Sequence, residues 1–182
     1  MTWKINRRKF LTISGTAAGA LMTAPNLLAQ NRKSIKFGVI TDSHYADRDP
    51  NGTRYYRGSM DKIRESINVF NQKKVDFVVH LGDFKDEDLN QKTEDTLSYL
   101  KTIEAEYAKF KGPRYHCIGN HDVDSITKAQ FLANVENTGI KTDSAHYSFD
   151  IKGFHFVVLD ANFDKNGKEH YFKDGADFQD VN

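Results

Sequence analysis

The sequence predicts an α/β fold in which short apolar strands alternate with amphipathic helices. Alternation of this kind gives a parallel sheet with right-handed crossovers. Each of the three apolar segments also ends in polar residues, as expected of strands that deliver side chains to one edge of a sheet. The predicted elements, in order, are residues 34–41 (strand), 59–70 (helix), 75–81 (strand), 93–111 (helix) and 115–118 (strand). We therefore predict a βαβαβ core.

The first 29 residues are expected to be an export signal that lies outside the fold. Residues 1–10 contain four basic side chains and no acidic one, residues 11–24 are weakly apolar, and Ala29 is a small residue suited to cleavage. Such a run is too short for a membrane span of ~20 residues. The segment 6–11, Asn-Arg-Arg-Lys-Phe-Leu, resembles a twin-arginine signal. It predicts export by the twin-arginine machinery to the periplasm or the exterior; a chance basic pair before an ordinary secretion signal is the alternative.

Removal of that signal leaves a mature domain, residues 30–182, with a small negative charge. The Lys+Arg count falls from 26 to 22 while Asp+Glu stays at 25, a net charge near −3. No basic block remains, so the sequence carries no strong signal for nucleic acid or membrane binding. The composition, 38% hydrophobic and 28% charged, is that of a globular domain. Cys117 is the only cysteine, so it cannot form an internal disulfide.

The first half of the predicted core has a recognisable strand, loop and helix. Residues 34–41 are apolar on both faces, which suits a strand buried in a parallel sheet. The polar loop that follows contains Asp-Pro-Asn-Gly at 49–52, a strong turn signal. We expect Ser59 to cap the first helix. Its apolar residues recur on one face: Met60, Ile63, Ile67 and Phe70.

The second half of the chain changes its pattern after the third strand. Gly112-Pro113 should end the second helix, and a short helix is expected over about 125–135. Residues 146–151 and 154–159 then alternate apolar and polar side chains around Lys152-Gly153. Alternation across a two-residue turn predicts an antiparallel hairpin.

Side chains that bind metals follow each predicted strand. Asp42 and His44 follow the first, Asp83 the second, and Asn120 and His121 the third. Taken singly, these residues would be ordinary turn residues at strand ends. Together they should line one crevice, where mixed carboxylate and imidazole ligands suit manganese, iron or zinc better than calcium or magnesium. A shared carboxylate would allow two ions about 3.5–4 Å apart, as in phosphoryl displacement.

Three motifs in this order resemble the signature D-x-H, GD-x-x-D, GNHD of calcineurin-like metallophosphoesterases. They are Asp42-Ser43-His44, the run 82–86 (Gly-Asp-Phe-Lys-Asp) and the run 119–122 (Gly-Asn-His-Asp). Each is weak alone, but three in order at strand ends are specific. The resemblance covers about 35–160. It implies an α/β fold that is the βαβαβ half of a four-layer αββα sandwich, with the second half truncated.

The resemblance also implies a metal-ligand set for a phosphoesterase. Asp42 and His44 would hold the first of two divalent metal ions (manganese, iron or zinc), Asp83 would bridge both ions, and Asn120 would bind the second. A hydroxide bridging the metals would attack a phosphomonoester, phosphodiester or pyrophosphate bond of a small phosphorylated substrate.

The resemblance assigns two further residues to the reaction. His121 would lie near the leaving group, as a proton donor or charge stabiliser. Asp122 would orient the His121 ring. Asp86, apart from the resemblance, is expected to support the site from behind its ligands or to cap a loop rather than to bind a metal.

The sequence departs from the family pattern in one respect. Family members carry a later Gly-His and Gly-His-x-His that supply three more histidine ligands, and these 182 residues contain neither. We therefore expect an N-terminal part of a longer protein that holds the second metal poorly. The alternative is an inactive remnant with a partial metal site. A phosphatase with an aspartate nucleophile is less suited, because it would need a second aspartate where His44 stands.

Two short runs, 44–47 (His-Tyr-Ala-Asp) and 54–57 (Arg-Tyr-Tyr-Arg), are similar to the manganese-dependent ADP-ribose/CDP-alcohol diphosphatase branch of the family. That branch implies a nucleotide diphosphate derivative as substrate, with Arg57 on its phosphate. Arginine forks suit phosphate oxygens and tyrosine faces suit a base or sugar. The alternative is a solvated lead-in to the first helix. His80 and His116, inside apolar strands, are expected to be core residues.

Overall fold

The computed structural model describes residues 34–141, 143–163 and 166–169. The expected export signal lies outside these residues. Every element described below lies in the compact unit Ile35–Asn182. Within the described part of the chain, no helix is long and apolar enough to cross a membrane.

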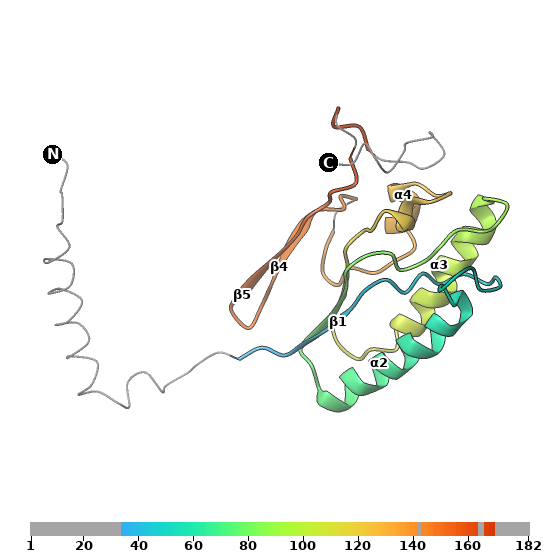
Figure 1. Ribbon diagram of the computed structural model, residues 1–182. Coiled ribbons are helices and arrows are strands. Elements are labelled where there is room, and N and C mark those ends of the chain that lie inside the picture. Colours follow the sequence, from blue (N-terminus) through green and yellow to red (C-terminus); the bar gives the residue numbers. More distant parts are fainter. Residues whose placement is uncertain (1–33, 142, 164–165, 170–182) are drawn as a thin grey trace, which may run out of the picture. The chain divides into compact units, whose positions relative to one another are not determined.

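A parallel sheet of three strands, in the order β1-β2-β3, forms the centre of this unit (Figure 1). Its strands are β1 (Phe37–Ile40), β2 (Phe77–His80) and β3 (Arg114–His116). The crossovers contain α2 (Ser59–Lys73) and α3 (Thr93–Tyr107). Phe37 pairs with Phe77, and Val78 pairs with Arg114. The predicted βαβαβ core is confirmed.

The two faces of the sheet meet different partners because side chains alternate along a strand. Val78 of β2 packs in a core with α2 and α3 residues such as Ile67 and Ile103. Its neighbours Phe77 and Val79 point the other way, into a second core with the hairpin. Helices and hairpin therefore lie on opposite faces of the sheet, as Figure 1 shows. The described residues form three layers, and the four-layer sandwich stays a prediction.

The hairpin forms where the sequence predicted it. Strands β4 (Tyr147–Ile151) and β5 (Phe154–Val158) pair antiparallel, with Ile151 opposite Phe154. The turn residues Lys152 and Gly153 have φ of 52° and 80°. Positive φ at both turn residues matches the right-handed strand twist. The hairpin packs on the sheet through stacked rings, with Tyr115 and Phe149 centroids 3.6 Å apart.

Strand β1 differs from the prediction, which buried it on both faces. Gly38 is buried on the helix side, but Phe37 and Val39 are 45% and 46% exposed. The hairpin packs mainly over β2 and β3, so it leaves the hairpin-side face of β1 half open. Gly38 is needed on its side because a Cβ there would lie 2.6 Å from the ring of Phe70.

Helix boundaries also differ from those predicted. Ser59 is the first residue of α2 rather than its cap, and its hydroxyl donates to the carbonyl of Tyr56 in the short 3₁₀ turn η1 (Tyr56–Gly58). Helix α3 ends at Tyr107, ahead of the predicted Lys111. The predicted helix 125–135 is shorter, as α4 (Lys128–Leu132). It begins after Thr127, which forms a capping box with Gln130.

Candidate metal centre

The loops that follow β1 and β2 are joined by backbone hydrogen bonds. The N–H of Asp42 donates to Gly82 at 3.1 Å, and that of His44 donates to Asp83 at 2.9 Å. Asp42, His44 and Asp83 all have left-handed backbones, with φ of 55°, 46° and 54°. Each such residue costs roughly 1–3 kcal/mol and persists where surrounding contacts over-determine it, typically at functional sites. The strain therefore falls on three predicted metal ligands.

The loops after β2 and β3 touch at two glycines. A Cβ on Gly82 would lie 2.6 Å from the nitrogen of Gly119, and a Cβ on Gly119 would lie 2.2 Å from Asp83 Oδ1. Gly82 also has φ +108°, which side chains rarely adopt. Glycine at both positions lets the N–H of His121 reach Asp83 Oδ1 at 3.0 Å. The second and third motifs are thus in direct contact.

The first metal ligands lie close enough to share a cation. His44 Nε2 is 3.5 Å from Asp83 Oδ2 and 3.8 Å from Asp42 Oδ1. One ligand atom from each residue lies within 4.8 Å of the others. Two carboxylates and one imidazole form a donor set that suits a first-row divalent ion. Asn120 lies between Gly119 and His121, so its backbone is held beside Asp83.

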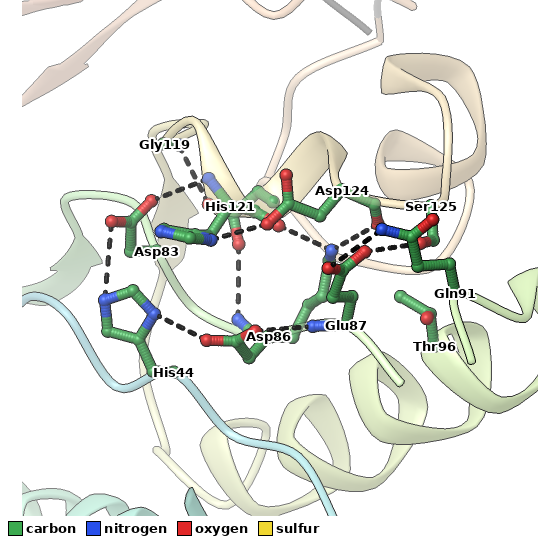
Figure 2. Close-up of polar contacts among 12 residues, drawn as sticks. His44, Asp83, Asp86, Glu87, Gln91, Thr96, Gly119, His121, Asp124 and Ser125 are labelled. Atoms are coloured by element: carbon green, nitrogen blue, oxygen red, sulfur yellow. Dashed lines mark hydrogen bonds and ion pairs between the residues drawn. The ribbon is translucent and has the colours of Figure 1, made fainter. Parts of the chain in front are cut away.

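Asp86 holds the far side of the His44 ring, as Figure 2 shows. Its Oδ2 is 3.2 Å from His44 Nδ1, which leaves His44 Nε2 directed toward Asp42 and Asp83. Metal-bound histidines are commonly oriented in this way by a carboxylate on the other nitrogen. Burial raises the pKa of Asp86, but the hydrogen bonds from His44 and a backbone N–H outweigh it and bring the pKa to about 2. One ligand atom each of His44, Asp86 and His121 lies within 4.8 Å of the others, so these three residues form a second group that could hold an ion.

Ser43, which lies between the predicted ligands Asp42 and His44, is held in place by the core histidine His80. The ring of His80 is fully buried, and its Nε2 is 2.8 Å from the Ser43 hydroxyl. The N–H of Gly82 donates to His80 Nδ1 at 3.3 Å. His80 is thus a satisfied core residue, as predicted, and it ties the first loop to the second. His116 is also buried, with Nε2 3.0 Å from Glu104 Oε2.

The residue that contacts the His121 ring differs from the predicted Asp122. Asp124, not Asp122, contacts that ring: Nδ1 is 2.5 Å from Asp124 Oδ2 (Figure 2). Burial lowers the pKa of His121, but the hydrogen bond and charge of Asp124 outweigh it and raise the pKa. Sequence reasoning missed Asp124. The available signal was the i, i+3 spacing in a turn, which brings side chains onto one side.

Asp122 instead holds the two loops together through backbone groups. Its carboxylate accepts from the N–H groups of Phe84 at 2.8 Å, Lys85 at 3.3 Å and Gly119 at 2.8 Å. The side chain is fully buried. Burial raises its pKa to about 6, against the lowering effects of the Lys85 charge and the N–H donors. Asp122 therefore holds the loops together through these backbone groups.

Arg57, the predicted phosphate ligand, is turned away from the site. It pairs with Asp47 and Asp49 at 2.5 and 2.7 Å, and its side chain is 53% exposed. Arg54 lies at the site instead, with Nη1 3.1 Å from Asp86 Oδ2 and Nη2 3.3 Å from His121 Nε2. The two arginines belong to one run, 54–57, and the geometry favours Arg54 over the predicted Arg57 for a role at the site.

A pocket of about 390 Å³ opens beside the predicted ligands. Asp42 and His44 form one wall. Arg54, Tyr55 and Lys62 contribute two cations and an aromatic ring to its lining. The pocket therefore offers groups suited to phosphate oxygens and to a planar ring, next to the candidate metal ligands.

Comparisons with known proteins identify the family of this chain. A family model described as calcineurin-like phosphoesterase matches residues 35–180. This chain therefore belongs to the calcineurin-like phosphoesterase family. The resemblance predicted from the three motifs is confirmed.

Relatives within the family come from the predicted branch. The chain is 31% identical over 139 residues to a protein of Arabidopsis thaliana named manganese-dependent ADP-ribose/CDP-alcohol diphosphatase, a match covering 72% of this chain and 44% of that protein. A protein of the same name from Oryza sativa subsp. japonica is 32% identical over 142 residues, with coverages of 73% and 43%. The crystal structure of a dimetal phosphatase from Danio rerio matches with a TM-score of 0.63 and 30% identity, covering 74% of this chain and 47% of that one. This chain spans less than half the length of these relatives.

A substitution at Gly119 tests the contact between the second and third loops. Gly119→Ala should weaken Mn²⁺ binding by roughly ten-fold or more, because its Cβ would displace the Asp83 carboxylate. Titration calorimetry of the purified chain with Mn²⁺ measures the effect. Gly58→Ala is the matched control, since its Cβ would meet no atom nearer than 3.7 Å. Equal Mn²⁺ affinity in the Gly119→Ala and Gly58→Ala variants would contradict the proposed geometry.

Proposed function

We propose that this protein is a metal-dependent hydrolase of phosphoester or pyrophosphate bonds in small phosphorylated substrates. The observation that carries the proposal is the position of Asp83. Its Oδ2 faces His44 at 3.5 Å, and its Oδ1 accepts the His121 N–H at 3.0 Å. One carboxylate thus joins the first and third motifs.

Each residue has a definite task in this proposal. Two divalent ions, when bound, supply an activated water and positive charge for the phosphoryl oxygens. Asp42, His44 and Asp83 would hold the first ion, and Asp83 with Asn120 would contribute to the second. Manganese, iron and zinc all suit these ligands, and the names of the relatives favour manganese.

Other residues would act on the substrate rather than on the ions. Arg54 presents a guanidinium beside His121 Nε2, where a phosphoryl oxygen or leaving oxygen can accept its N–H groups. His121 directs Nε2 to the same place. Asp86 keeps the Arg54 and His44 side chains in position through hydrogen bonds at 3.1 and 3.2 Å.

The substrate class favoured is a nucleoside diphosphate derivative. The pocket beside the ligands combines Arg54 and Lys62 with the ring of Tyr55, which is 69% exposed. A diphosphate and a base or sugar match this pairing of cations and aromatic surface. The named relatives act on ADP-ribose and CDP-alcohols, which belong to this class.

A partial, inactive site is the second candidate. Asp42, His44 and Asp83 would give three ligands to one ion. In the ligand set that the family resemblance implies, the second ion would have only Asp83 and Asn120 from this chain. An ion with two protein ligands is held weakly. Metal analysis of the 182-residue chain distinguishes the two readings: one bound ion without turnover favours the partial site, and two bound ions with turnover exclude it.

Asp83→Asn tests the proposed chemistry. Both ions lose a charged ligand, so turnover of the metal-loaded protein should fall by several powers of ten. A panel of phosphomonoesters, phosphodiesters and nucleoside diphosphate derivatives serves as substrates. Asp150→Asn, on the exposed hairpin, is the control and should retain full activity. Comparable rates for the two variants would refute the assignment.

Arg54→Ala and Arg57→Ala form a matched pair for the substrate pocket. Arg54→Ala should raise KM for a nucleoside diphosphate derivative about ten-fold, as expected for loss of a charge-assisted hydrogen bond. Arg57→Ala should leave it within two-fold, because Arg57 pairs with Asp47 and Asp49 outside the pocket (roughly neutral surface pairs). A larger rise in KM for Arg57→Ala than for Arg54→Ala would indicate that Arg57, not Arg54, contacts the substrate.

We further propose that residues 1–29 export the folded protein through the twin-arginine route. Replacing Arg7 and Arg8 by lysine should leave the precursor inside the cell, because that route reads the arginine pair. Immunoblots of cell fractions measure it. Unchanged secretion of the double variant would favour an ordinary secretion signal.

A further inference from the structure

The contact between His121 and Asp124 comes from a 3₁₀ turn. Element η2 (His121–Val123) begins at His121, and Asp124 is its C-cap. Residues three apart lie one above the other in a 3₁₀ turn. Their side chains therefore meet on one side of the turn, and His121 Nδ1 lies 2.5 Å from Asp124 Oδ2 (Figure 2).

The Asp124 carboxylate is buried and depends on this contact. Its side chain is 3% exposed, and among the described residues no hydrogen-bond partner is found for Oδ1. Asp122, two residues earlier, is served by three backbone N–H groups. A buried carboxylate is costly unless it is paired. The His121 imidazole is what offsets the burial of Asp124.

Lys85 locks the turn that carries both residues. Its side chain is fully buried, and Nζ donates to the carbonyl of His121 at 2.5 Å and to that of Asp124 at 2.8 Å. One ammonium group thus holds both ends of the turn from the neighbouring loop. A buried lysine is rare unless its donors are satisfied. Lys85 was not singled out by the motifs, although it lies inside the second one.

One ring nitrogen of His121 faces a hydrogen-bond acceptor and the other faces a donor. Asp124 Oδ2, opposite Nδ1, is an acceptor when ionised. Arg54 Nη2, 3.3 Å from Nε2, can only donate. These two neighbours are compatible with a single neutral tautomer, with hydrogen on Nδ1 and the lone pair on Nε2.

We propose that Lys85 and Asp124 are positioning residues that hold His121 in the Nδ1–H tautomer, with Nε2 facing the substrate pocket. The inference deepens the proposed function and rests on it for its catalytic meaning. Lys85 sets the turn, Asp124 accepts the Nδ1 hydrogen, and Nε2 is directed to the place beside Arg54 where the substrate would bind. The histidine of the GNHD motif is then oriented by Asp124, two residues after the aspartate of the motif.

Nitrogen-15 NMR of the metal-free chain, labelled at histidine, tests the proposal without turnover. The chain has seven histidines, and a spectrum of His121→Gln assigns the His121 ring. At alkaline pH, where the ring is neutral, wild-type His121 should show Nδ1 protonated and Nε2 unprotonated. Asp124→Ala should move it to the Nε2–H form or to a mixture, and Lys85→Met should produce a partial shift in the same direction.

The chain supplies its own control and a rescue. Asp150→Ala removes the partner of an exposed pair, His155 Nδ1 to Asp150 Oδ1 at 3.0 Å, and should leave the His121 signals unchanged. Asp124→Asn keeps an acceptor oxygen and a similar volume, so it should retain the Nδ1–H tautomer even if the alanine variant folds poorly.

The outcomes separate this inference from the proposed function. An Nε2–H tautomer in the wild type, or an unchanged tautomer in folded Asp124→Ala, would overturn the positioning role. A chain that hydrolyses no substrate but shows the predicted tautomer shift would count against the proposed function alone.

Discussion

The close approach of two backbone loops governs this site. Gly82 and Gly119 touch where β2 and β3 end, and a methyl group on either would push into backbone or into Asp83. Only at this separation can the His121 N–H reach the Asp83 carboxylate. The ligands at the ends of different strands then share one space. The glycines of the second and third motifs are therefore steric requirements, independent of any chemistry.

Buried charges reinforce that approach. Asp122 accepts backbone N–H groups from both loops, while Lys85 donates across them to the His121 and Asp124 carbonyls. Burying either charge alone would cost much free energy, and burying the two opposite charges together offsets part of that cost. Burial lowers the pKa of Lys85, and Asp122 raises it. The arrangement holds the loops in the strained conformations that a cation site uses.

Much of the fold and part of the site were predictable from residue order. The βαβαβ alternation, the hairpin turn at Lys152-Gly153 and the group Asp42, His44 and Asp83 follow from local patterns. Helix ends were less predictable, because Gly58 and Thr127 compete with nearby residues as caps. The exposed face of β1 was missed because apolar composition cannot say which neighbour covers a strand.

The sequence by itself determined the fold class and the candidate ligands, because strand and helix periodicity and strand-end motifs are local properties. The tertiary structure alone decided which arginine meets His121. Arg54 and Arg57 look equivalent in the chain, yet 67 residues separate Arg54 from His121, and only folding brings them to 3.3 Å. The tertiary structure likewise decided that Asp124, not Asp122, pairs with the His121 ring. A carboxylate pairs with the donors that surround it in the folded loops, and those of Asp122 are backbone N–H groups.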